Sequence, residues 1–129
     1  MARARGTIGR DSYPVAIHAG DHDLTADEGP ALGGGDKGPA PFELLAAALS
    51  ACTAITLRMY ADRKGWPMQG IEVDVHYVKT GDEPARIERT LSFQGAPDPE
   101  QIARLADIAE RTPVTLAIKG GVPITTTVV

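Results

Sequence analysis

The amino-acid sequence predicts an α+β fold in which an antiparallel sheet is covered by a separate layer of helices. Three observations predict this class: segments of alternating hydrophobicity that come in pairs, one long apolar helix between them, and a second helix with its own capping pattern. Because the strands come in runs rather than alternating singly with helices, a parallel α/β sheet is not expected. The 129 residues are expected to form a single domain, residues 1–129.

The N-terminal part of the chain is expected to hold short strands. Tyr13–His18 and His22–Ala26 are joined by a turn that contains Gly20, which is typical of a β-hairpin. Thr7–Arg10 is predicted as a strand that precedes this hairpin. Residues 28–41 follow, and their density of glycine and proline predicts a loop. We do not expect this loop to bind phosphate, because Gly-Pro rather than Ser or Thr follows its lysine.

The longest helix is predicted from Pro41 to Lys64. Proline suits the first helical position, and Gly65 is placed to end the helix. The first half of the helix is apolar on nearly every side, which indicates burial all round. A small domain offers too little sheet to cover such a helix, so we expect its other side to pack against a second copy of the chain in an obligate homodimer.

The second half of the chain is predicted to contain a longer hairpin and further helices. Ile71–Val78 and Arg86–Gln94 alternate between apolar and polar residues, so each strand should have one buried and one wet face. An Asp-Pro-Glu-Gln capping box opens a helix at Asp98. Thr112 is predicted to cap a short helical segment, and the β-branched residues of Val122–Val129 predict a final strand.

Composition and charge exclude several classes of function. The net charge of −4 argues against a nucleic-acid-binding protein, because that role needs a basic surface. A single cysteine suits a reducing compartment, and no apolar segment follows the basic N-terminal residues as in a secretory signal, so we expect a cytoplasmic protein. The longest apolar run, Leu44–Leu57, is too short to cross a bilayer, so no membrane association is expected.

Cys52 is the only cysteine and lies in the middle of the long predicted helix. A cysteine on an apolar helix is more often a small core residue than a nucleophile, so both interpretations stay open. A reactive thiol needs a nearby cation or hydrogen-bond donor, which another element must supply here. Glu43 lies in the first turn of the same helix, where the helix dipole also favours a carboxylate. About 13.5 Å of helix separates it from Cys52, so the two can meet only across a two-fold dimer.

The segment GGGDKGPAPFELLAAALSACTAITLRMYADRKGW resembles the OsmC/Ohr family of hydroperoxide-reducing thiol proteins. The order of predicted elements also fits this family along nearly the whole chain. The resemblance implies an intertwined α+β dimer with both active sites at the subunit interface. It implies that Cys52 is the nucleophile and that Glu43 is the family's glutamate, one residue closer to the cysteine than in typical Ohr members.

Two positions depart from the family pattern. The family's second, resolving cysteine precedes a Pro-Val step, and Thr112 stands there in this chain. A threonine can cap a helix or hydrogen-bond a sulfur, but it cannot form a disulfide. The family's activating arginine has no clear match. Candidates by location are Arg10, His18 and Lys37, each of which is more commonly a solvated surface or turn residue.

The sequence therefore favours a cysteine-based peroxidase with an antioxidant role. The Cys52 thiolate is expected to attack an organic hydroperoxide, release the alcohol and become a sulfenic acid. Because Thr112 replaces the resolving cysteine, regeneration would need an external thiol such as glutathione or a dihydrolipoyl group. The alternative is a catalytically impaired OsmC-like dimer that binds a small apolar ligand or senses oxidation.

No metal or other cofactor is expected. His18 and His22 lie on one predicted hairpin, but two histidines with one distant cysteine are a poor ligand set. The acidic residues between positions 21 and 28 lack the spacing of a calcium-binding EF-hand loop.

Overall fold

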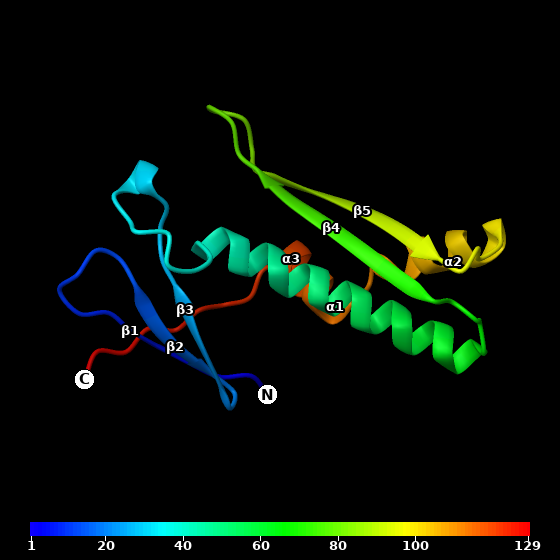
Figure 1. The fold of residues 1–129 in the computed structure, drawn as a ribbon, viewed down its shortest axis with the longest axis horizontal. Coiled ribbons are helices and arrows are strands. Elements are labelled where there is room, and N and C mark those ends of the chain that lie inside the picture. The colour runs from blue at the N-terminus through cyan, green and yellow to red at the C-terminus, as the bar shows by residue number, and fades with distance from the viewer. The chain divides into compact units, whose positions relative to one another are not determined.

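The structure is a computed structural model that describes residues 1–129. It has the α+β composition that the sequence predicts, with antiparallel strands and one long helix (Figure 1). The chain forms two compact units, Met1–Leu45 and Ala46–Val129. The expectation that the whole chain is one domain stays a prediction.

The first unit contains a three-stranded antiparallel sheet in the order β1–β2–β3. Its strands are β1 (Ala4–Thr7), β2 (Val15–Ala19) and β3 (His22–Ala26). The predicted β-hairpin is confirmed, and Gly20 adopts a φ of +57° in its turn. A positive φ of this kind is readily adopted by glycine, which has no Cβ.

The predicted strand Thr7–Arg10 is wrong in position. The first strand ends at Thr7, which pairs with Ala16, and the residues after it leave the sheet. The physical reason is the extent of the neighbouring strand, which begins at Val15. Residues 8–10 therefore have almost no backbone opposite them with which to form a ladder.

The glycine-rich loop is organised by Asp27, which is buried at the end of β3. Its carboxylate accepts the backbone N–H groups of Tyr13, Glu28 and Lys37 at 3.2, 2.7 and 3.1 Å. A single 3₁₀ turn, η1 (Pro30–Leu32), lies within the loop. A Cβ atom at position 34 would lie 1.9 Å from a backbone carbonyl oxygen, so only glycine fits there. The loop is thus held by hydrogen bonds between its backbone and the Asp27 side chain.

Helix α1 (Pro41–Lys64) begins and ends at the predicted residues. Four residues spaced four apart form its buried stripe, namely Leu49, Thr53, Leu57 and Ala61. On the opposite side, Ile55 and Met59 are 54% and 58% exposed. In the single chain the helix is therefore covered on one side only.

By length and apolar composition, α1 would also be able to cross a membrane. The run Leu44–Leu57, on which the sequence prediction depended, understates the apolar length of the helix. The core helix of a soluble protein satisfies the same criterion, so one such helix is weak evidence for a membrane span.

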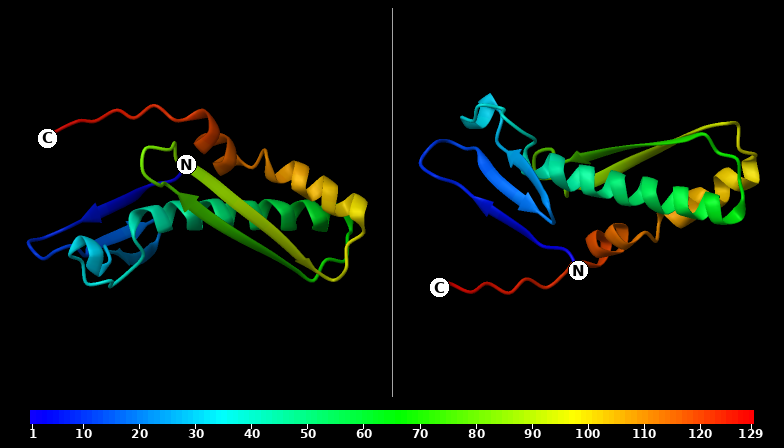
Figure 2. Two further views of the ribbon diagram at one scale, coloured as in Figure 1. Left: turned by 90° about the horizontal axis from the view of Figure 1, so that it is seen from above. Right: turned by 60° about the horizontal axis from the view of Figure 1, so that its bottom comes forward.

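The second unit contains a hairpin of two nine-residue strands and two further helices. Strands β4 (Gly70–Val78) and β5 (Arg86–Gln94) pair along their whole length and form a separate two-stranded sheet. Helix α2 (Pro99–Ala109) begins with the predicted capping box at Asp98. Helix α3 (Pro113–Gly120) follows after a short break. Figure 2 shows the hairpin and α2 lying alongside the second half of α1.

The core of the second unit joins α1 to α2 and the hairpin. Its buried members are Leu57, Ala61, Met68, Leu105 and Ala109. Partly buried residues of the hairpin pack against this cluster, including Ile71, Leu91 and Phe93. The aromatic side chains are few, so the core is mainly aliphatic, as the composition suggests.

The predicted final strand Val122–Val129 is wrong for the single chain. These residues form no strand, and Ile124 and Val128 are 90% and 92% exposed. β-Branched residues favour extended backbone, but a strand also needs a hydrogen-bonded neighbour. No strand of the same chain pairs with this segment, which is drawn in red to the C-terminus in Figure 2.

Candidate functional site

Cys52 meets the first turn of α3. Its partly buried Sγ accepts the backbone N–H of Val114 at an N···S distance of 3.5 Å. Val114 is the second residue of α3, and the first N–H groups of a helix have no partner within it. A helix N-terminus carries partial positive charge, so it favours a thiolate over a thiol. The donor that the sequence analysis required from another element is therefore supplied by α3.

Thr112 is the N-cap of α3 and is fully buried. Its Oγ1 accepts the backbone N–H of Thr115 at 3.3 Å. It also lies 2.6 Å from the side-chain Oγ1 of Thr115. The capping role that the sequence predicts for Thr112 is confirmed. Its hydroxyl is engaged with Thr115 rather than with the sulfur of Cys52.

Arg89 is the polar residue that sequence reasoning missed. It lies on β5 between Ile87 and Leu91, on the face that packs toward the core. Its side chain is only 12% exposed. The available signal was the alternation of the strand, because an arginine at this register falls on the apolar face. A buried arginine needs several oxygen partners, and such partners are provided here.

The guanidinium of Arg89 contacts three helices. Its Nη1 donates to the Oγ1 of Thr53 at 3.1 Å and to the Oγ1 of Thr115 at 3.0 Å. Its Nη2 donates to the carbonyl oxygen of Ala109 at 2.9 Å. These partners belong to α1, α3 and the end of α2, so one side chain of the hairpin links three helices.

A pocket of about 230 Å³ opens beside this network. Three apolar and four polar residues line it, namely Leu49, Ile87, Ile118, Arg89, Glu110, Thr115 and Lys119. Glu110 accepts a 2.7 Å hydrogen bond from Lys119 and lies 3.7 Å from Arg89. The hydrogen bond and charge of Lys119 lower the pKa of the Glu110 carboxyl, and Arg89 adds to the effect. The pocket thus combines an apolar wall with an ionised polar rim.

Glu43 makes a local contact at the start of α1. Its carboxylate accepts the backbone N–H of Ala40 at 2.9 Å, which is one of the two bonds of a capping box, the one from the N-cap backbone to the side chain of the third helical residue. This contact agrees with the helix-terminus interpretation of the residue. A role of Glu43 toward Cys52 stays a prediction, because it depends on a second chain.

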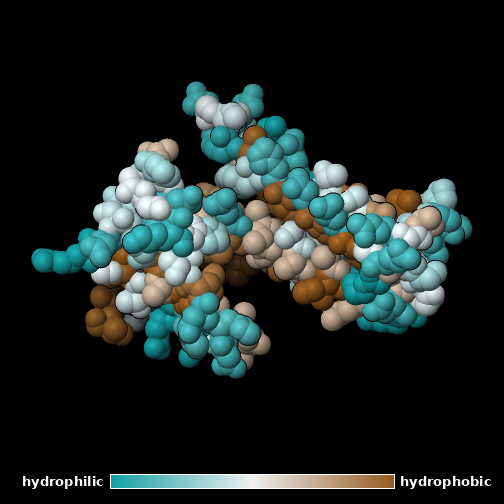
Figure 3. All heavy atoms as spheres, in the orientation of Figure 1, coloured by the Kyte–Doolittle hydropathy of each residue, from teal (hydrophilic) through white to brown (hydrophobic).

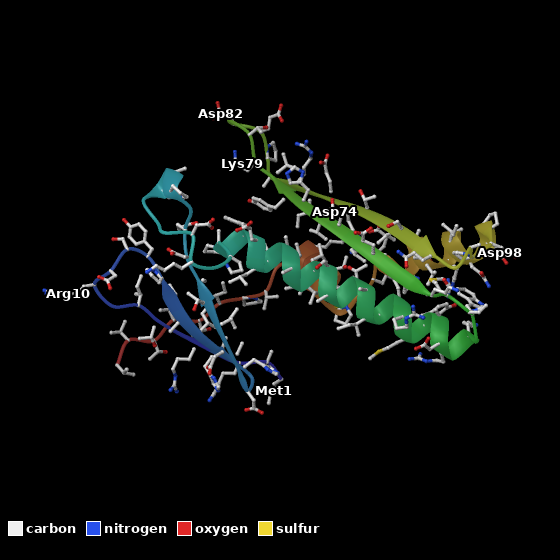
Figure 4. All side chains as sticks on the ribbon, viewed as in Figure 1. Met1, Arg10, Asp74, Lys79, Asp82 and Asp98 are labelled. Carbon is white, nitrogen blue, oxygen red and sulfur yellow. The ribbon has the colours of Figure 1, made fainter.

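The three predicted cations belong to the first unit, and the contacts found for them lie within that unit. The Nδ1 of His18 lies 2.7 Å from the carboxylate of Asp23, across the hairpin. Lys37 donates its backbone N–H to the loop-organising carboxylate. Arg10 is exposed and points away from the ribbon at the tip of the connection after β1 (Figure 4). Activation of Cys52 by any of the three stays a prediction.

No group of three or more His, Cys, Asp and Glu side chains lies close enough together to hold a metal ion. The two histidines of the first hairpin, His18 and His22, are both exposed. They are therefore polar surface residues of β2 and β3.

Comparisons with known proteins identify the family. Residues 34–127 match the family described as OsmC-like protein. Among solved structures, the OsmC-like protein from Mycoplasma pneumoniae is similar with a TM-score of 0.79 and 17% identity, over 94% of this chain and 89% of that one.

Two further similar structures bear names that refer to hydroperoxides. The organic hydroperoxide resistance protein OhrB of Bacillus subtilis has a TM-score of 0.63 and 26% identity, over 94% of this chain and 92% of that one. The organic hydroperoxide resistance protein OsmC from Legionella pneumophila has a TM-score of 0.65 and 23% identity, over 93% and 90%. No curated protein matches the chain. The match of the family over most of the sequence, together with this shared fold, shows that the chain belongs to the OsmC/Ohr family.

Proposed function

We propose that the protein is a thiol peroxidase that reduces organic hydroperoxides through Cys52. The observation that carries this proposal is the hydrogen bond from the Val114 N–H to the Cys52 sulfur at the N-terminus of α3. Such a donor stabilises the thiolate, which is the nucleophilic form. Membership of the OsmC/Ohr family supports the same activity, as do the names of the two similar hydroperoxide resistance proteins.

The chemistry is a two-electron transfer from sulfur to peroxide. The Cys52 thiolate attacks the distal oxygen of ROOH, and the O–O bond breaks. The alkoxide leaves as the alcohol after it takes up one proton, and the sulfur becomes a sulfenic acid. The apolar side chains around the helix favour a hydrophobic peroxide over hydrogen peroxide.

Regeneration requires a thiol from outside the chain. Thr112 carries no sulfur and its hydroxyl is bonded to Thr115, so no disulfide can form within the protein. A first external thiol condenses with the sulfenic acid, and water leaves as the mixed disulfide forms. A second thiolate then attacks this disulfide and releases Cys52 in the reduced state. We propose a small-molecule or lipoyl-type thiol as the reductant.

We further propose that the working form is a homodimer in the cytoplasm. Figure 3 shows apolar side chains at the surface along α1. Ile55 and Met59 are more than half exposed there, and the C-terminal residues 122–129 lack a strand partner. Burial of apolar surface contributes about 25 cal/mol per Å², which favours a second copy of the chain over solvent. In such a dimer, Glu43 of the partner subunit would complete the site at Cys52.

The test of the activity is consumption of cumene hydroperoxide in the presence of dithiothreitol or dihydrolipoamide. The wild-type protein should turn over many times, and Cys52→Ser should lose activity by about a hundred-fold or more. Ser50→Ala, on the same helix, serves as the matched control. Equal rates for wild type and Cys52→Ser would reject the proposal.

The pocket beside Arg89 favours one alternative function, the binding of a small apolar ligand or the stoichiometric sensing of oxidation. Its volume of about 230 Å³ lies below the range of about 300–1,000 Å³ typical for drug-sized ligands, so it would hold only a smaller molecule. Under this alternative, Cys52 would be oxidised once per chain, and added dithiol would not sustain turnover. Mass spectrometry of the protein after one and ten equivalents of peroxide separates the two functions.

A further inference from the structure

A single guanidinium nitrogen joins two helices at the point where Cys52 meets its N–H donor. The Nη1 of Arg89 donates to Thr53 at 3.1 Å and to Thr115 at 3.0 Å. Thr53 directly follows Cys52 in α1, and Thr115 directly follows Val114 in α3. The residue after Cys52 and the residue after its N–H donor Val114 are thus hydrogen-bonded to the same nitrogen of Arg89.

The rest of the guanidinium is also held in place. Its Nη2 donates to the carbonyl oxygen of Ala109 at 2.9 Å and lies 3.7 Å from the Glu110 carboxylate. These residues lie just before α3, so the chain is bound to Arg89 on both sides of the N-cap. The backbone of Arg89 pairs with that of Val75 in the β4–β5 ladder. A planar fork with several donors suits this arrangement, because its nitrogens point in fixed directions.

We propose that Arg89 is a positioning residue for Cys52. It fixes the first turn of α3 against α1, keeps the Val114 N–H directed at the sulfur, and thereby increases the reactivity of the thiol. The inference rests on the proposed function, since it assumes that Cys52 acts as a nucleophile. The N···S contact of 3.5 Å depends on where α3 begins, so a small displacement of this turn would remove it.

The effect of the charge of Arg89 can be separated from the effect of its hydrogen-bond geometry by substitution. The charged groups around the junction are Arg89 from β5, Glu110 at the end of α2 and Lys119 from α3. A lysine in place of Arg89 keeps the positive charge but has one nitrogen, which cannot reproduce the fork that binds two hydroxyls and a carbonyl. Arg89→Lys therefore tests geometry, while Arg89→Met removes both charge and hydrogen bonds.

The experiment measures the rate of Cys52 alkylation by iodoacetamide from pH 5 to 10 on the full chain. In Arg89→Lys, Arg89→Met and Thr115→Val, the rate at pH 7 should fall about tenfold, because the Val114 N–H would no longer be held against the sulfur. Arg86→Met is the matched control, because this arginine lies on the same strand with an exposed side chain. Its alkylation should equal that of the wild type. If Arg89→Met does not fold, Thr115→Val still tests the inference, because it removes one of the hydroxyls that Arg89 binds.

The outcomes distinguish this inference from the proposed function. Alkylation of Arg89→Lys and Thr115→Val at the wild-type rate would overturn the positioning role, even where peroxide turnover is confirmed. A wild-type protein without peroxide turnover, but with Arg89-dependent alkylation, would overturn the proposed function and support the inference. Peroxide turnover should fall in the same order as alkylation, while the control keeps its full rate.

Discussion

Asp27 illustrates how one residue fixes a whole loop. Its buried carboxylate gathers backbone N–H groups from either side of β3, including those of Tyr13 and Lys37. Burial acts to raise the pKa of this carboxyl, but four backbone N–H donors outweigh it and hold the pKa below its ordinary value. The charged form therefore contributes stability above the unfolded pKa of about 4, and this contribution is lost as pH falls through the folded pKa.

We expect Asp27→Asn to lower the melting temperature at pH 7, because the amide offers one acceptor oxygen and places N–H groups against N–H groups. The difference from the wild type should be smaller at pH 3, because this lies below the unfolded pKa of about 4, where the contribution of the charged form begins to be lost. Thermal denaturation at both pH values measures this. Asp23→Asn is the control, since that carboxylate is 89% exposed. A difference that is the same at both pH values would contradict the role assigned to the charge.

The candidate site was partly predictable at the scale of single residues. Cys52 and Thr112 stand out in the sequence because their residue types and positions match a known pattern. Arg89 does not, since an arginine in a strand of mixed residues is most often solvated. Its burial depends on oxygens from Thr53, Thr115 and Ala109, which lie between 20 and 36 residues away along the chain. Alternation places Arg89 on the apolar face of β5, but it does not show which distant oxygens pair with the guanidinium.

Thr112 provides a second test at the residue scale. We expect Thr112→Val to lower both stability and alkylation of Cys52, because the N-cap of α3 and the hydroxyl contact with Thr115 are both lost. Loss of a cap costs about 1 kcal/mol. Thr112→Ser should retain most of both properties. Urea unfolding and alkylation of the two variants measure this. Equal stability and equal alkylation rates of Thr112→Val and Thr112→Ser would contradict the capping role of the hydroxyl.

Helix α1 presents two apolar faces with different roles. Leu57 is fully buried in the core of the second unit, whereas Met59 lies on the exposed side. The periodicity of the sequence does not separate these faces, because both are apolar along the helix. Only the position of α2 and the hairpin decides which stripe is covered within one chain.

Leu57→Ala should reduce the free energy of unfolding by about 2–5 kcal/mol, as expected for a large-to-small change in a packed core. Leu116→Ala, at a position that is 52% exposed, is the matched control and should have a much smaller effect. Urea titration followed by circular dichroism measures both. A similar loss in the two variants would show that Leu57 is not a core residue.

The positions of the helices and of the long hairpin were more predictable than the pairing of the shorter strands. Local signals located α1, the long hairpin and the capping box of α2, since proline, glycine and alternation act within a few residues. The two errors, Thr7–Arg10 and Val122–Val129, both concern strands whose assignment depends on what lies opposite them. Intrinsic preference for extended backbone does not determine whether a neighbour is present.

At the scale of the whole molecule, the apolar face of α1 argues for assembly. We expect Ile55→Asp combined with Met59→Asp to convert the proposed dimer into monomers, because two carboxylates on each copy would be buried unpaired. Leu32→Asp is the control, since it places a charge on an exposed apolar residue of the 3₁₀ turn. Sedimentation equilibrium measures the mass of each variant. A wild-type protein that sediments as a monomer would remove the basis for this proposal.

The cap of α3 also bears on the proposed catalytic cycle. In a chain with a second thiol at position 112, a disulfide to the oxidised sulfur would have to form at the N-cap of this helix and break again in every round. With a threonine there, no such bond forms, and the proposed cycle changes only the oxidation state at position 52. The oxidised protein can then persist for as long as the surrounding reductant is scarce, so its lifetime would follow the redox supply of the cell rather than any motion of its own.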